Sequence, residues 1–268
     1  MSPTTWKRVV CEVGDAPLDP ELLRGLIRGD HGVIVLKGLL PSAEFTANRR
    51  RVLDMFHHAS TARYHNGALT TIGPYLARYM DNVADYFTAA EDNQAVTSAA
   101  GFDLDVRVRA RLAEVFGLDS CEPAEERDGR RYAPSILRIH ADGVRNPLHN
   151  DNIMRDGAES GLSIAKLLYQ LSCVVCVQEC DEGGELQIYR RPWSAADEAH
   201  KVTGGLGYHD AVTAGAESDL FKPETEDVYL INPTNYHEIH TVGGADRLTL
   251  GFFVGFYDDE LRDAVTWS

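Results

Sequence analysis

Residues 235–256 read NYHEIHTVGGADRLTLGFFVGF, a segment in which two histidines and an arginine precede a long apolar run. The run from Leu248 to Phe256 predicts a buried strand, because it combines aromatic and branched residues over the length of a strand. Burying Arg247 at its start is unfavourable unless the guanidinium pairs with an anion, and its planar fork matches a carboxylate in bidentate geometry. Arg247 therefore predicts a carboxylate partner, either on a ligand or within the protein.

The segment PLHNDN supplies a histidine and a carboxylate two residues apart, His149 and Asp151. In an extended chain these side chains point to the same side and can converge on one point. A histidine from the first segment would complete two histidines and one carboxylate, the ligand set of non-haem Fe(II) oxygenases. His237 and His240 are three residues apart and face opposite sides of a strand, so only one can join the set. The pattern does not decide between them, and His149 and Asp151 also suit a simple turn.

Short apolar runs separated by glycine, proline, asparagine and aspartate predict a mainly β second half. The expected strands are Ser135–His140, Leu167–Gln178, Gly184–Tyr189, Asp227–Ile231 and Leu248–Phe256. The first half is expected to hold a strand over residues 31–38 and helices over residues 43–56 and 73–116. This order predicts an α+β fold with a mainly β core, an antiparallel sandwich or barrel against which the N-terminal helices pack.

We expect a single domain over residues 1–268. Residues 1–130 would hold the N-terminal strand and helices, and residues 131–268 the β core with the metal site. No strand is followed by a glycine-rich phosphate-binding loop, which argues against nucleotide-binding α/β folds.

The charge balance argues against several partners. The chain has 26 Lys and Arg against 41 Asp and Glu, a net charge of −15 at pH 7, so we expect no nucleic-acid and no membrane partner. It shows no long apolar run and no signal-peptide pattern, which predicts a cytoplasmic protein. Five cysteines, three of them within residues 173–180, predict buried reduced thiols rather than disulfides or a zinc site. The oligomeric state is not indicated.

The order of these motifs resembles that of the Fe(II)/2-oxoglutarate-dependent oxygenases, whose core is a double-stranded β-helix, a jelly-roll of cupin type. The resemblance rests on His149-Asn-Asp151, Gly183-Gly-Glu-Leu186, His237 and Arg247 ten positions later. Within this superfamily, residues 31–268 look most similar to the freestanding aliphatic halogenases of cyanobacterial indole-alkaloid pathways. The segments that carry this likeness include GVIVLKG at 32–38, YAPSILR at 132–138, HNDN at 149–152 and GGELQIY at 183–189.

The resemblance implies a role for each matched residue. His149, Asp151 and His237 would hold Fe(II), since the ten-residue spacing to Arg247 favours His237 over His240. Arg247 would bind the distal carboxylate of 2-oxoglutarate, the co-substrate that reacts with O₂. Two further candidates, Arg138 and Thr249, would contact the co-substrate. For Arg138 the alternative is a structural salt bridge. Asn152 and Ser172 would be outer-sphere residues around the iron or substrate.

One departure from the halogenases concerns the reaction. They carry glycine where this chain has Asp151, and the missing carboxylate leaves room for a halide on the iron. The resemblance therefore implies hydroxylation of an unactivated C–H bond in a free small molecule of specialised metabolism, such as an amino acid, an amine or an alkaloid. The alternatives are desaturation or cyclisation, halogenation despite Asp151, and a non-catalytic β-barrel module holding a structural metal such as zinc. A dependence of the activity on 2-oxoglutarate would distinguish the enzymes from this non-catalytic module.

Overall fold

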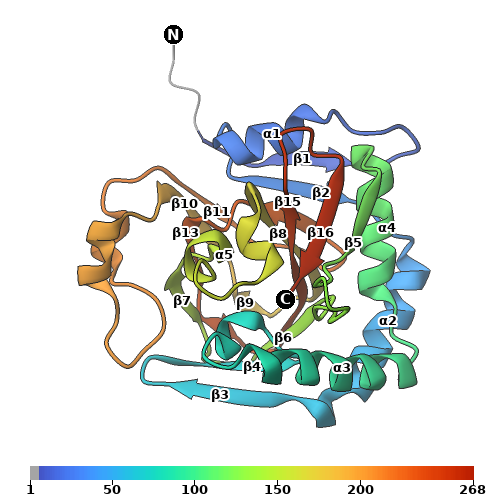
Figure 1. Ribbon diagram of the computed structural model, residues 1–268, viewed down its shortest axis with the longest axis horizontal. Coiled ribbons are helices and arrows are strands. Elements are labelled where there is room, and N and C mark those ends of the chain that lie inside the picture. Colours follow the sequence, from blue (N-terminus) through green and yellow to red (C-terminus); the bar gives the residue numbers. More distant parts are fainter. Residues whose placement is uncertain (1–5) are drawn as a thin grey trace.

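The computed structural model describes residues 6–268 (Figure 1). The first five residues of the expected domain lie outside the described residues. The expectation that the chain begins without a signal peptide rests partly on these five residues. Its largest element is a ten-stranded sheet in the order β1-β2-β12-β8-β15-β6-β4-β3, with β16 beside β15 and β5 beside β16. The strands are β1 (Val9–Glu12), β2 (Val33–Lys37), β3 (Ser60–Tyr64), β4 (Gly67–Ile72), β5 (Ser120–Pro123), β6 (Ile136–His140), β8 (Tyr169–Gln178), β12 (Val228–Ile231), β15 (Arg247–Phe256) and β16 (Asp263–Trp267).

A second, four-stranded sheet has the order β11-β10-β13-β7. Its strands are β7 (Asn146–His149), β10 (Leu186–Pro192), β11 (Ser218–Phe221) and β13 (Asn235–Ile239), and a separate two-stranded ribbon joins β9 (Glu182–Gly183) to β14 (Val242–Gly243). Apolar side chains of both sheets form one buried cluster, for example Val35 and Tyr229 with Ile188 and Ile239. The two sheets therefore pack face to face, which confirms the expected jelly-roll core.

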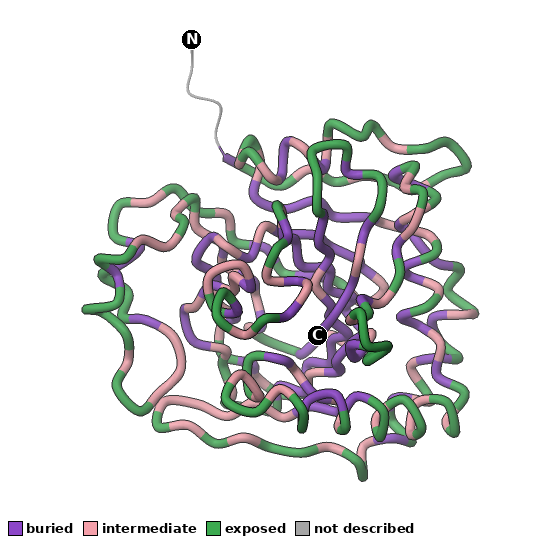
Figure 2. The backbone as a smooth tube through the Cα atoms, viewed as in Figure 1, coloured by how far each residue is buried: buried purple, intermediate pink, exposed green. Residues whose placement is uncertain are grey.

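Helices cover the opposite face of the large sheet (Figure 1). They are α1 (Glu21–Arg28), α2 (Ser42–Asp54) and α4 (Leu104–Phe116), whereas α3 (Val83–Ala99) and the short α5 (Ile153–Asp156) contribute their buried side chains to a separate cluster with Trp267. In β2, Ile34 and Leu36 join the helix-side cluster whereas Val33 and Val35 face the small sheet. A strand buried on both faces reads as a continuous apolar run, which explains VIVLK. Figure 2 shows the buried residues concentrated between these layers.

The structure corrects several expected element bounds. Within residues 73–116, which were expected to be helical, the structure has a 3₁₀ turn at Leu76–Tyr79 before α3 and α4 begin. The hairpin β3–β4, whose strands are joined by His65 and Asn66, was not expected. The strand expected at Gly184–Tyr189 runs instead over β10, because positive-φ glycines end the chain's extended course before Leu186. Among residues 6–268, no helix is long and apolar enough to cross a bilayer.

The thiol prediction agrees with the structure. All five cysteines are free, and Cys173, Cys176 and Cys180 are buried. Burial raises the pKa of Cys176 to about 12, because the low-dielectric interior disfavours the thiolate. These thiols therefore serve as small apolar side chains in the core.

The glycine-rich loop at residues 203–207 is fixed against β7. The Tyr208 amide donates to the Leu148 carbonyl at 2.8 Å, and the Asn66 side chain donates to the Leu206 carbonyl at 2.9 Å. Gly207 has φ +74°, and a Cβ placed there would lie 2.0 Å from the Leu148 carbonyl oxygen. Only glycine fits this contact, which holds the loop beside the end of β7.

We predict that Gly207→Ala destabilises the protein more than Gly204→Ala does. Both glycines lie in the left-handed region, at φ +74° and +68°, and this backbone strain alone disfavours alanine by about 1–2 kcal/mol. A Cβ at Gly204 meets no atom within 4 Å, so Gly204→Ala is the matched control. Forcing β7 to move should make Gly207→Ala worse by about 1–3 kcal/mol more. Urea unfolding of both variants measures the difference, and equal losses would contradict the close contact.

Candidate active site

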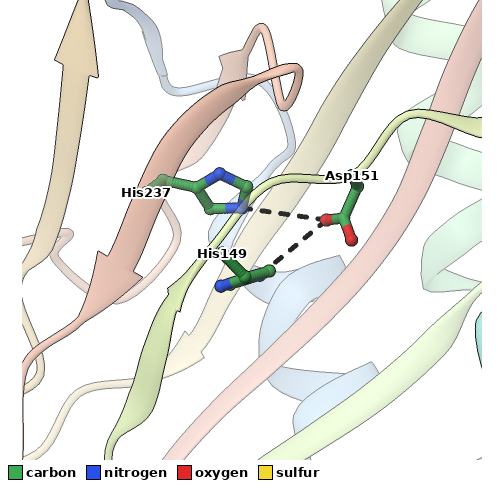
Figure 3. A group of neighbouring side chains, drawn as sticks. All are labelled: His149, Asp151 and His237. Carbon is green, nitrogen blue, oxygen red and sulfur yellow. Dashed lines mark ion pairs between the residues drawn. The ribbon is translucent and has the colours of Figure 1, made fainter. Parts of the chain in front are cut away.

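Three side chains meet at the end of β7 (Figure 3). His149 is the last residue of β7 and pairs directly with His237 on β13, while Asp151 follows β7 by two residues. The Nε2 atom of each histidine lies 3.8 Å from the same Asp151 oxygen. One ligand atom from each residue falls within 4.8 Å of the others. This separation suits three ligands of a single metal ion.

The strands themselves orient both imidazoles. His149 Nδ1 lies 2.7 Å from the Pro147 carbonyl oxygen, and His237 Nδ1 lies 3.0 Å from the Asn235 carbonyl oxygen. A carbonyl only accepts hydrogen bonds, so each Nδ1 donates and each Nε2 presents its lone pair to the centre of the group. Burial, reinforced by the neighbouring His149, lowers the pKa of His237 to about 4. His237 is therefore neutral at pH 7, the state that a metal ligand requires.

His240 lies outside this group. It follows the end of β13, is partly exposed, and its Nε2 lies 2.8 Å from the Gln187 side-chain oxygen. Its Nδ1 lies 3.7 Å from Glu185. The group therefore consists of His149, Asp151 and His237, and His240 is not part of it.

A cavity between the two sheets extends from this group; we call it the inner cavity. Its lining residues comprise the three described above, the apolar Val174, Leu186, Ile231 and Ile239, and the polar Arg138, His140, Asn146, Ser172, Tyr229, Arg247 and Thr249. Arg247 is only 3% exposed and donates to the Tyr229 hydroxyl at 3.2 Å. Within residues 6–268, neither Arg247 nor Arg138 has a carboxylate within 4.0 Å, so the salt bridge considered for Arg138 does not form. Two cations without a protein anion make the inner cavity suitable for an anionic ligand.

A second cavity, the outer cavity, adjoins the same group. Its walls are mostly apolar or aromatic and consist of Tyr75, Leu76, Ala77, Met80, Arg138, Asp151, Asn152, Ile153, Asp156, Gln170, Phe253 and Trp267. Asp151 and Arg138 line both cavities. The group His149, Asp151 and His237 therefore stands where a cavity lined by two arginines meets a mostly apolar one.

The remaining candidates separate into two kinds. Ser172 and Thr249 line the inner cavity, on neighbouring strands β8 and β15. Asn152 lines the outer cavity, but its side-chain oxygen accepts the Arg155 amide at 3.1 Å, so it caps α5. Sequence reasoning missed His140, which could have been found because it lies two positions from Arg138 on β6 and so faces the same side.

A jelly-roll core that carries two histidines and a carboxylate at one cavity has the architecture of non-haem Fe(II) oxygenases. Residues 9–268 match the family described as the carrier-protein-independent halogenase WelO5. The chain belongs to this family, within the Fe(II)/2-oxoglutarate-dependent oxygenases.

Individual relatives agree with this assignment. The leucinostatins biosynthesis cluster protein S of Purpureocillium lilacinum is 29% identical over 163 residues, 59% of this chain and 65% of that protein. The L-gamma-glutamyl-L-propargylglycine hydroxylase of Streptantibioticus cattleyicolor is 30% identical over 141 residues, 52% of this chain and 50% of that protein. This chain thus spans between half and two thirds of these curated relatives.

A solved structure shows the same fold over nearly the whole chain. The N-substituted L-amino acid dioxygenase of Burkholderia ambifaria, in complex with alpha-KG, superposes with a TM-score of 0.59. The match covers 93% of this chain and 91% of that one at 16% identity.

We predict that the metal-free protein loses stability in acid. Burial lowers the pKa of His237 to about 4 and that of His140 to about 3. In the unfolded chain both regain a pKa of about 6.5, so below that pH the unfolded state binds more protons than the folded state. The free energy of unfolding should therefore fall as the pH falls towards about 4, by up to about 1.4 kcal/mol per pH unit for each histidine. Chemical unfolding of chelator-treated protein at several pH values measures this slope.

Two variants control that measurement. Replacing His140 with phenylalanine should flatten the slope, because one proton-linked site is removed. The same change at the partly exposed His240 should leave the slope as in the wild type. A stability that stays constant from pH 7 down to about pH 5 would contradict the burial of neutral histidines.

Proposed function

We propose that this chain is an Fe(II)- and 2-oxoglutarate-dependent hydroxylase that acts on an unactivated C–H bond of a free small molecule. The observation that carries the proposal is the convergence of the Asp151 carboxylate with two oriented imidazoles at the junction of the two cavities. The donor set fits Fe(II), because two neutral nitrogens and one carboxylate occupy one face of an octahedron. The other positions would remain for the co-substrate and O₂.

The inner cavity supports 2-oxoglutarate as the co-substrate. Arg247 lies opposite His140 in the β15–β6 pairing, and Thr249 lies opposite Arg138 two residues further along. Arg138 lines both cavities together with Asp151, and this carboxylate opposes the lowering of the pKa of Arg138 by burial. We assign the distal carboxylate to Arg247, whose partner Tyr229 holds the guanidinium in place, and the keto-acid end to the side near Arg138.

When bound, the iron would supply, with O₂ and 2-oxoglutarate, the oxidising power that C–H cleavage requires. The protein's own task is to bind and orient the reactants. The strand-held imidazoles would fix the metal, and the buried Arg247 would align the co-substrate. Because the inner and the outer cavity adjoin the same metal group, the co-substrate and the substrate could occupy different cavities.

Asp151 supports oxygen transfer over halogen transfer. Its carboxylate projects into the group at equal distances from both Nε2 atoms, and so takes the place that a halide would need. Hydroxylation is also the reaction named for the relative from Streptantibioticus cattleyicolor. The family match itself favours a second candidate, halogenation, and the product distinguishes the two.

The outer cavity supports a substrate with an aliphatic or aromatic body. Leu76, Met80, Ile153, Phe253 and Trp267 form its walls. The carboxylate of Asp156 at this cavity is already paired with Arg155, at 2.6 and 2.9 Å. The cavity thus recognises mainly shape and apolar surface, and an amino acid, amine or alkaloid of modest size is the substrate class that we propose.

We predict that Arg247→Ala weakens 2-oxoglutarate binding by about 10- to 100-fold, since one charge-assisted contact to a carboxylate is lost. Anaerobic titration of the Fe(II)-loaded protein with 2-oxoglutarate measures this through the charge-transfer band of the chelated keto acid. Arg191→Ala is the matched control, because Arg191 pairs with Asp197 and lines neither cavity. Metal binding without any such band in the wild type would favour a structural-metal module instead.

We predict that the wild-type protein transfers oxygen even when chloride or bromide is present. The substrate is found by screening amino acids, amines and alkaloids for 2-oxoglutarate consumption, and mass spectrometry of the product then identifies the atom added. Halogenated product from the wild type would overturn the hydroxylase assignment. Asp151→Gly should lower hydroxylation at least about 100-fold, because a ligand is lost, and halogenation gained by this variant would support exclusion of halide by the carboxylate.

A further inference from the structure

His140 is a buried polar side chain without a partner. It lies on β6, is 1% exposed, and neither ring nitrogen has a hydrogen-bond partner within the described residues 6–268. A buried group left unsatisfied disfavours the folded state by about 1–3 kcal/mol, so such groups are few in folded proteins. The proposed roles of the metal group and of Arg247 do not use this imidazole.

The strand pairing places His140 beside the anion-binding end of the inner cavity. It lies directly opposite Arg247 on β15, and it shares its face of β6 with Arg138. It also lines the inner cavity itself. The ring is therefore next to the guanidinium to which we assign the distal carboxylate.

The charges around His140 indicate what completes its hydrogen bonds. The groups that influence it are Arg247, Arg138 and His149, and burial with these neighbours lowers its pKa to about 3. A neutral imidazole offers one N–H donor and one acceptor. Since the charged neighbours at this end are cationic, an anionic ligand is the partner that both Arg247 and the imidazole N–H favour.

We propose that His140 donates a hydrogen bond to the distal carboxylate of 2-oxoglutarate, beside Arg247, and so contributes to selection of a dicarboxylate co-substrate. This inference rests on the proposed function. The neutral His140 ring would orient the carboxylate without adding a positive charge, because its N–H would bind one carboxylate oxygen. Arg247 would supply the cationic contact. The pair would reject a 2-oxo acid that lacks the second carboxylate, since both donors would then stay unsatisfied.

The test measures binding rather than turnover. Calorimetry with the Ni(II)-loaded full chain compares 2-oxoglutarate with 2-oxopentanoate, which keeps the keto acid but lacks the distal carboxylate. We expect His140→Leu to weaken 2-oxoglutarate about tenfold and to change 2-oxopentanoate by less than about twofold. His140→Gln, which retains an N–H donor, should recover most of the 2-oxoglutarate affinity. His240→Leu is the control histidine and should change neither ligand.

Each outcome decides a separate point. Equal affinity of the wild type and His140→Leu for 2-oxoglutarate overturns the inference and leaves the proposed function standing. Equal weakening of both 2-oxo acids also overturns it, because that result indicates a general effect on the cavity. Absence of 2-oxoglutarate binding to the metal-loaded wild type overturns the proposed function and this inference together. If His140→Leu does not fold, His140→Phe keeps a planar ring without a donor and carries the same comparison.

Discussion

The pairing of β7 with β13 is the constraint on which the site depends. It sets His149 opposite His237, although the two residues are far apart in the sequence. Each ring is held by a carbonyl two residues earlier on its own strand, so the strand geometry fixes the side-chain orientation as well as the position. Asp151 completes the group because the chain leaves β7 immediately after His149 and turns back towards β13. A shift of one residue in this register would turn either histidine away from its partner.

The large sheet contributes the environment of this group. Its strands β6, β8, β12 and β15 place their cavity-facing side chains opposite the small sheet, and these are polar or cationic only where the cavity opens. Elsewhere the same faces are apolar and close the sandwich. Arg138 and Asp151 line both cavities and lie between the inner cavity, which Arg247 also lines, and the mostly apolar outer cavity.

Sequence patterns predicted a mainly β core of sandwich or barrel type, the long strands and the convergence of His149 with Asp151, because strand periodicity and apolar runs are local signals. The jelly-roll form of this core was implied by the family resemblance. They did not choose between His237 and His240, since that choice depends on which residue pairs with β7. The spacing to Arg247, known from a family resemblance, supplied what local pattern lacked. The outer cavity was missed for the same reason, because it arises from contacts between segments distant in the chain, such as Tyr75 and Phe253. The β3–β4 hairpin joins neighbouring segments and was missed although its contacts are local.

The position of β2 has a consequence for biosynthesis. This apolar strand lies inside the large sheet, between β1 and β12, yet its partner β12 follows about 190 residues later in the chain. At a synthesis rate of about 5–20 residues per second, the edge of β2 (VIVLK) that pairs with β12 stays unpaired for on the order of 10–40 seconds. During that interval only the neighbouring β1 and the first helices can shield it. Nascent chains of this protein thus expose an aggregation-prone strand edge, and recovery of folded protein in a heterologous host will depend on chaperone supply and temperature.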